Sequence, residues 1–323
     1  MKKIKIGYRW LLCLCLLFVS QIQAQTTYPA PNTMSVEDAY QLGDLLVDQY
    51  KIKQGQPYLK YAADNGNAKA ALAYSWTFRT NMMAQTPKEH EYAVIAAELG
   101  SEDAKFVLST STNIYGDRDK YRIPLVKKLK IEAAQGDANA MNMLHFLSPD
   151  KSNDWLKKAA KYGNAKAQAS LASMYAGGDG WFFIPGKREK EVKRLYKASA
   201  EQGNFRGMEG YASIIYDEGN KKEALDIWTK MANTGDAFSI IFLAAQYLHS
   251  LPGITYPEKD EVLGAAYSKI YLDSMGTDKK QSLYEIYKED YLEAMSHLSE
   301  AQKEQVNEFA KEFLKTHTVR VLR

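Results

Sequence analysis

The residues best suited to chemistry in this sequence are five histidines, many carboxylates and one glycine-rich cluster. The histidines are His90, His145, His249, His297 and His317. No two of them stand three or four residues apart, the helical spacing at which two imidazoles can bind one zinc ion. The pattern therefore predicts no metal site, and we expect no cofactor.

Motifs that activate a nucleophile or hold a phosphate are also missing. The sequence has no G-x-S-x-G elbow, no G-x-G-x-x-G and no Walker loop, because the glycines of residues 177–180 are followed by Trp181 instead of Lys-Ser. Carboxylates such as Glu201 and Glu218 are common in any long helical protein, and nothing marks an acid–base pair. We predict that the protein is not an enzyme, and an enzyme acting on cell-wall material is the weakest alternative.

The charge of the chain depends on its N-terminus. The 323 residues have a formal net charge of +3, but four of the 42 Lys and Arg residues lie in the first 24 positions, which leaves 38 against 39 Asp and Glu. A nearly neutral body lacks the basic surface of a nucleic-acid binder. The only two cysteines, Cys13 and Cys15, lie in the same N-terminal segment, so the body has no disulfide and no thiolate site.

The N-terminal segment has the three parts of a secretory signal peptide. Four positive charges precede an apolar run over residues 10–19, and Ile22 and Ala24 occupy the −3 and −1 positions before Gln25. The run of ten residues is too short for a membrane span, which needs about 20. We expect residues 1–24 to be a cleaved signal peptide, residues 25–33 a linker, and the protein to be periplasmic without a membrane span.

Six copies of one pattern follow, and each is centred on a glycine. An alanine stands three residues before each glycine, a small residue four after it, and Leu or Tyr eight after it. Asn or Asp follows five of the glycines and can cap a following helix, while the glycine suits the left-handed end of the preceding one. The glycines are Gly66, Gly100, Gly136, Gly163, Gly203 and Gly235, and Gly276 would close a more degenerate seventh unit.

This pattern predicts an all-α fold, an α/α solenoid of about seven helical pairs over residues 34–276. One helical pair cannot bury its apolar face alone, but a stack of pairs can. Residues 277–323 read as two charge-rich amphipathic helices, with Ser299 and Gln302 spaced as in a capping box. We expect them to cap the C-terminal end of the solenoid.

The segments YLKYAADNGNAKAALAY and WLKKAAKYGNAKAQASLASMYAGGDG resemble Sel1-like repeats, the α/α relatives of tetratricopeptide (TPR) repeats. The resemblance implies a scaffold whose concave face binds other proteins. Exported members of that family include immunity proteins that occlude lipase effectors of type VI secretion, so it also implies a lipase-type toxin as the partner. An envelope adaptor that organises cell-wall or membrane proteins is the alternative.

The strongest candidate for partner binding is a loop that contains Trp181, Phe182 and Phe183. An exposed apolar patch marks an interaction site, and Trp is common at hot spots. The alternative is an enlarged loop that buries these side chains against the helices. Further candidates are aromatic residues placed on the first helices of the pairs, namely Tyr40, Trp76, Tyr115 and Tyr211.

Overall fold

The computed structural model describes residues 28–80, 85–112, 114–250, 257–278 and 281–322. The predicted signal peptide and the start of the predicted linker lie outside these residues. The described chain is all-helical, and no helix in it is both long and apolar enough to cross a membrane. The α-helices are α1 (Val36–Asp48), α2 (Ile52–Asp64), α3 (Ala68–Trp76), α4 (Pro87–Glu98), α5 (Glu102–Thr110), α6 (Arg118–Ala134), α7 (Ala138–Leu147), α8 (Ser152–Lys161), α9 (Ala165–Ala176), α10 (Lys187–Glu201), α11 (Phe205–Asp217), α12 (Lys221–Ala232), α13 (Ala237–Leu248), α14 (Glu261–Ser274), α15 (Gln281–His297) and α16 (Glu300–Thr316).

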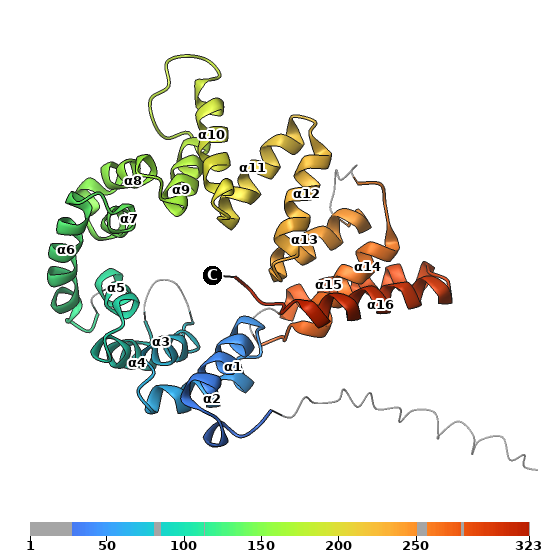
Figure 1. Cartoon of the computed structure of the whole chain (residues 1–323), viewed down its shortest axis with the longest axis horizontal. Helices are drawn as coiled ribbons and strands as arrows, with labels where there is room; N and C mark the ends of the chain where they lie inside the picture. Colours follow the sequence, from blue (N-terminus) through green and yellow to red (C-terminus); the bar gives the residue numbers. More distant parts are fainter. Residues whose placement is uncertain (1–27, 81–84, 113, 251–256, 279–280, 323) are drawn as a thin grey trace, which may run out of the picture.

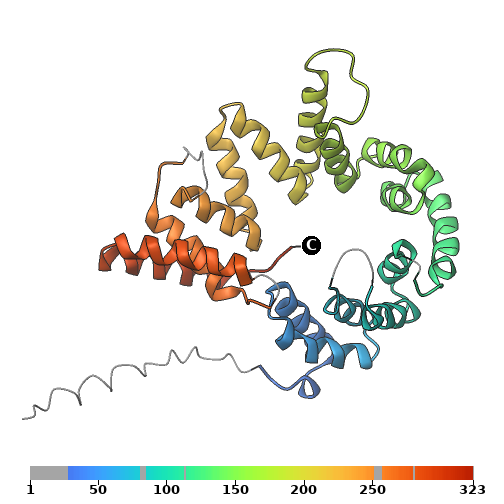
Figure 2. The same cartoon turned by 180° about the vertical axis from the view of Figure 1, so that it is seen from behind.

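The helices from α1 to α14 pack in sequence order, each on the next, and form seven antiparallel pairs. The stack curves until its two ends meet, so that the protein has the outline of a ring (Figures 1 and 2). Helices α5 and α7 lie on the inner side of the ring, and α6 and α8 lie on the outer side (Figure 1). The predicted α/α solenoid of about seven units is confirmed.

The repeated glycine and the residue after it set where each inner helix begins. All six glycines have a positive φ, between 76° at Gly203 and 98° at Gly100, which a residue with a Cβ adopts at a cost. The next residue caps the following helix, as the Asn67 side chain does by accepting the Ala70 N–H at 2.9 Å. Ser101, Asp137, Asn164, Asn204 and Asp236 accept in the same way from the small residue three positions on.

The small residue at that position also lets the helices approach closely. Ala70, Ala104 and Ala167 are completely buried. At the equivalent Gly207, a Cβ would lie only 2.4 Å from the Ser199 hydroxyl of the preceding helix α10. The repeat pattern therefore specifies both the start of each inner helix and its contact with the helix before it.

Gly276 does not close a seventh unit in the expected way. Helix α14 ends at Ser274, Met275 is extended, and Gly276 is not among the glycines with positive φ. Instead the Gly276 N–H donates to the Gln49 carbonyl at the end of α1, at 2.6 Å. This glycine therefore belongs to the junction between the last and the first pair.

The C-terminal helices α15 and α16 pack on α14, and the predicted capping box at Ser299 and Gln302 is present. Beyond them, residues 317–322 form an extended segment, which we call the closing tail. Its backbone pairs with the start of α13 through Arg320 N–H to the Gly235 carbonyl and Ala237 N–H to the Arg320 carbonyl, both at 3.0 Å. Val319 is buried among core residues of α12, α13 and α14.

The closing tail also binds α1 at the other end of the solenoid. Arg320 forms ion pairs with Asp44 and Asp48, and the Gln49 side chain donates to the Val319 carbonyl at 2.9 Å. Nearby, Asp278 accepts the Lys53 N–H at 2.9 Å at the start of α2. The C-terminal segment thus does more than cap the solenoid, because it joins the last units to the first.

Candidate functional site

The residues suited to acid–base chemistry are dispersed. His90 lies 3.1 Å from Asp117, and His297 lies 3.1 Å from Glu261, which also pairs with Lys259 at 2.7 Å. The Ser152 hydroxyl lies 2.8 Å from Nδ1 of His145, but in the described part of the chain no carboxylate bonds the other nitrogen of that ring. A nucleophile needs a base that is oriented by a third group, and this pair lacks one. Among the described residues, no group of three or more His, Cys, Asp and Glu side chains could hold a metal ion.

The segment between α9 and α10 carries the most exposed aromatic side chains. We call residues 178–186 the aromatic loop. Trp181 and Phe183 are each 88% exposed, and their rings stack with centroids 6.2 Å apart. Ile184 is exposed as well. Of the two alternatives that the sequence left open, the structure has the one in which the loop presents apolar side chains to solvent, and partner binding at this loop stays a prediction.

Phe182 differs from its neighbours, because it holds the aromatic loop to the body of the protein. Its ring packs edge-on against Tyr175 of α9, with centroids 5.0 Å apart. The Arg188 guanidinium lies 4.9 Å from the centre of the Phe182 ring and donates to the Tyr175 and Gly180 carbonyls at 2.9 and 3.0 Å. Phe182 is therefore a supporting residue, and Trp181 and Phe183 are the residues that face solvent.

Basic side chains surround the base of the aromatic loop. A hollow of about 680 Å³ is lined by Trp181 and Phe182 together with three lysines that we call the basic collar, Lys157, Lys187 and Lys190. Arg194 and Glu191 also line it, but they bond to each other at 2.7 and 2.8 Å. These hydrogen bonds hold the pKa of Glu191 below its usual value, so that its charge stays balanced by Arg194.

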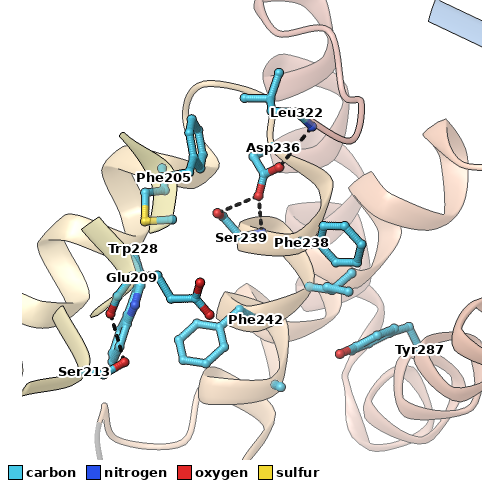
Figure 3. Close-up of a pocket in the computed structure, with 13 residues that line it drawn as sticks. Phe205, Glu209, Ser213, Trp228, Asp236, Phe238, Ser239, Phe242, Tyr287 and Leu322 are labelled. Atoms are coloured by element: carbon cyan, nitrogen blue, oxygen red, sulfur yellow. Dashed lines mark hydrogen bonds between the residues drawn. The ribbon is translucent and has the colours of Figure 1, made fainter. Parts of the chain in front are cut away.

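A second hollow, which we call the inner pocket, lies between α11 and α13 and is also lined by α12 and by Tyr287 of α15 (Figure 3). Its volume is about 430 Å³. Trp228 of α12 contributes a buried wall, and Phe205, Phe238 and Phe242 contribute aromatic surface. Leu322 of the closing tail also lines the pocket, and Figures 1 and 2 show this tail running from α16 toward the middle of the ring.

Polar groups occupy one side of the inner pocket. Asp236 is buried, and its carboxylate accepts the N–H and the hydroxyl of Ser239, both at 2.8 Å. It also accepts the Leu322 N–H at 3.4 Å (Figure 3). Glu209 is exposed, and none of the ion pairs among the described residues includes it. The pocket therefore combines an apolar wall with one available negative charge.

The other candidates from the sequence do not form one site. Tyr40 lies on α1, Trp76 at the end of α3 and Tyr211 on α11, and each is half-buried against a hydrophobic core. Tyr115 lies on the segment between α5 and α6 rather than on a helix, where it stacks on His90 with ring centroids 3.9 Å apart. Of these four, only Tyr211 lies on a helix that borders the inner pocket.

Phe238 was not among the residues predicted from the sequence, although the repeats contain a signal for it. The position three residues after each repeat glycine is polar in five units, as Lys69, Asp103, Asn139, Lys166 and Arg206. In the sixth unit this position is Phe238, which is 43% exposed. An exposed Phe at a position where the other units are polar indicates a local role beyond packing.

No protein-family model and no curated protein sequence matches this chain. Its structure is similar to that of c5321, a protective antigen present in uropathogenic Escherichia coli strains with an SLR fold (15% identity, TM-score 0.48). That match covers 89% of this chain and 62% of the antigen, so this chain spans about three fifths of that protein's length. It is also similar to a Sel1 repeat protein from Oxalobacter formigenes, with 20% identity, a TM-score of 0.41 and coverage of 88% and 87%.

Proposed function

We propose that this protein is an exported helical scaffold that binds another protein through the inner pocket and carries out no chemistry of its own. The observation that carries the proposal is Phe238, an exposed aromatic side chain that lines an aromatic hollow between α11 and α13. Solenoids use the surface lined by one helix of each pair to bind other chains. Binding energy concentrates on aromatic anchors that fill pockets.

The composition of the inner pocket indicates what the partner would present. Its aromatic lining favours an apolar side chain, and the Glu209 carboxylate favours a basic group beside it. The backbone of residues 235–237 at the edge of the pocket is already paired with the closing tail, so the partner would be held by the side chains of the pocket. An extended or helical partner segment with an apolar residue next to Lys or Arg fits these features.

The more specific partner is a lipase-type toxin. It is suggested by the resemblance to exported Sel1-like immunity proteins, and it requires that the signal peptide deliver the chain to the periplasm. In this version, the scaffold binds the toxin tightly and covers the entrance to its active site. An envelope adaptor would instead bind several partners, each more weakly.

The test is to measure the affinity of purified scaffold for a partner obtained from its host, with Phe238→Ala as the test variant. Ile123→Ala is the matched control, because Ile123 is an exposed apolar residue on the outer helix α6. We expect Phe238→Ala to weaken binding by about tenfold or more, since a hot-spot residue contributes about 2 kcal/mol. Equal affinities of the two variants would contradict a partner site at the inner pocket.

A further inference from the structure

The aromatic loop and the basic collar together have the properties of a surface that docks on a lipid bilayer. The loop leaves the body of the ring between α9 and α10 and projects outward from it (Figures 1 and 2). Trp181 and Phe183 stand side by side on the loop, and Ile184 is exposed next to them. Apolar side chains on a projecting loop can insert into a flat surface. Side chains on the inner side of the ring cannot reach such a surface.

The exposure of these side chains is enforced by the structure behind them. Phe182 and Arg188 tie the loop to α9 through the ring contact and the hydrogen bonds described above. A Cβ at Gly180 would lie 2.9 Å from the Tyr175 ring, so the chain passes close to that side chain. Trp181 and Phe183 are therefore presented to solvent by a supported loop, and a preorganised surface binds at a lower entropic cost.

The charges around the aromatic loop indicate which kind of surface the loop binds. Helix α10 carries six basic residues and three acidic ones, although the chain beyond the signal peptide is nearly neutral. The three lysines of the basic collar are exposed, and none of them takes part in an ion pair among the described residues. They are free to contact phosphate groups while the apolar tip enters the layer beneath.

We propose that the aromatic loop docks this protein on a bilayer that contains anionic lipids. Trp181 and Phe183 would enter the boundary between headgroups and acyl chains, where aromatic side chains are favoured. Lys157, Lys187 and Lys190 would contact the lipid phosphates. The observations favour this over a protein partner at the loop, because a protruding apolar tip with a basic base complements a flat layer that is apolar inside and negative at its surface. This surface is separate from the inner pocket, so the two proposals can fail independently.

The experiment uses the chain from Gln25 onward, which contains every described residue, in co-sedimentation with vesicles. One set of vesicles is phosphatidylcholine alone, and the other contains roughly one quarter phosphatidylglycerol. The test variants are Trp181→Ala/Phe183→Ala and Lys187→Gln/Lys190→Gln. The matched controls lie on the exposed face of α6, as Ile123→Ala/Ile131→Ala and Lys127→Gln/Lys130→Gln.

We expect binding to the anionic vesicles, little binding to phosphatidylcholine, and a loss of about tenfold or more for both loop variants. Both α6 controls should bind like the unmodified chain. The proposal is overturned if the unmodified chain stays in the supernatant, or if the α6 variants lose as much binding as the loop variants. It is also overturned if a photo-crosslinker at position 181 labels a protein and no lipid in host membranes. Circular dichroism of each variant checks that the fold is retained.

Discussion

The guanidinium of Arg320, three residues from the C-terminus, donates from Nε to the Asp48 carboxylate at 2.8 Å, although the two residues are 272 positions apart in the sequence. Asp44, one turn earlier on α1, accepts from the same guanidinium at 2.6 Å. Asp48 is almost completely buried. A carboxylate in that position needs a partner, because an unpaired charge is costly to remove from water. This contact fixes the tail that joins the two ends of the solenoid.

Removing Arg320 should therefore destabilise the whole protein. Breaking a buried ion pair costs about 3–5 kcal/mol, and because Arg320 is partly exposed we expect about 2–4 kcal/mol for Arg320→Ala. The matched control is Arg194→Ala, which breaks a surface pair with Glu191 and should cost less than about 1 kcal/mol. Chemical denaturation measures both. Equal losses would show that the contact between tail and α1 is unimportant for stability.

Replacing Gly235 with alanine should destabilise the protein more than the same replacement at the equivalent Gly66. Both have a positive φ, but a Cβ at Gly235 would lie 2.2 Å from the Thr318 carbonyl oxygen, whereas nothing lies within 4 Å at Gly66. Gly66→Ala should cost about 1–2 kcal/mol from backbone strain alone. Gly235→Ala should cost clearly more and displace the closing tail. Hydrogen exchange at Ala237 reports on that displacement, because its N–H donates to the Arg320 carbonyl of the tail. Unchanged protection of this N–H would contradict the contact between Gly235 and the tail.

The repeat glycines and their capping residues could be located from the sequence, because each acts on the turn next to it. Asn67 and Ala70, for example, form one hydrogen bond within four residues. The ring could not be predicted in this way. It depends on Arg320, Asp44 and Asp48, whose pairing leaves no local pattern in the sequence. The helical pairs were therefore predictable from the sequence, whereas the C-terminal segment was predicted only to cap the solenoid.

The aromatic loop could be identified from the composition of the sequence, but the exposure of its side chains could not be predicted. Four consecutive large apolar residues, 181–184, can pack inward or face solvent. In the structure only Phe182 packs on the Tyr175 ring, and this contact leaves the other three side chains exposed. The inner pocket was missed because its wall combines α11, α12 and α13 with Leu322, which only the fold brings together.

Within the aromatic loop, the stability effects of neighbouring substitutions should differ. Trp181→Ala and Phe183→Ala remove exposed side chains, so the free energy of unfolding should change by about 0.5 kcal/mol or less. Phe182→Ala should cost about 1 kcal/mol because it loses the contact with Tyr175. Leu195→Ala, which empties a buried position in α10, should cost about 2–5 kcal/mol. A large loss for Trp181→Ala would mean that this side chain is buried in solution.

A charge on α15 should make stability depend on pH. Burial raises the pKa of Asp290, and the nearby carboxylates of Glu293 and Glu289 raise it further, while a hydrogen bond from Ser250 opposes the shift. A carboxyl whose pKa is raised by folding binds its proton more tightly in the folded state, so its negative charge costs stability at neutral pH. Asp290→Asn should therefore raise the melting temperature at pH 7. The gain should shrink as the pH falls through the pKa of Asp290, and a gain that stays constant with pH would contradict this assignment.

Site-specific photo-crosslinking in the native host is the most direct test of whether a partner protein binds at the inner pocket. A photoreactive phenylalanine derivative, which keeps the aromatic ring, replaces Phe238 on the pocket wall in one strain and the exposed Ile123 of α6 in another. We expect one discrete protein adduct from position 238 that is absent from position 123 and is lost in the Glu209→Lys variant. Adducts from position 123 alone, or the same adducts from both positions, would contradict it.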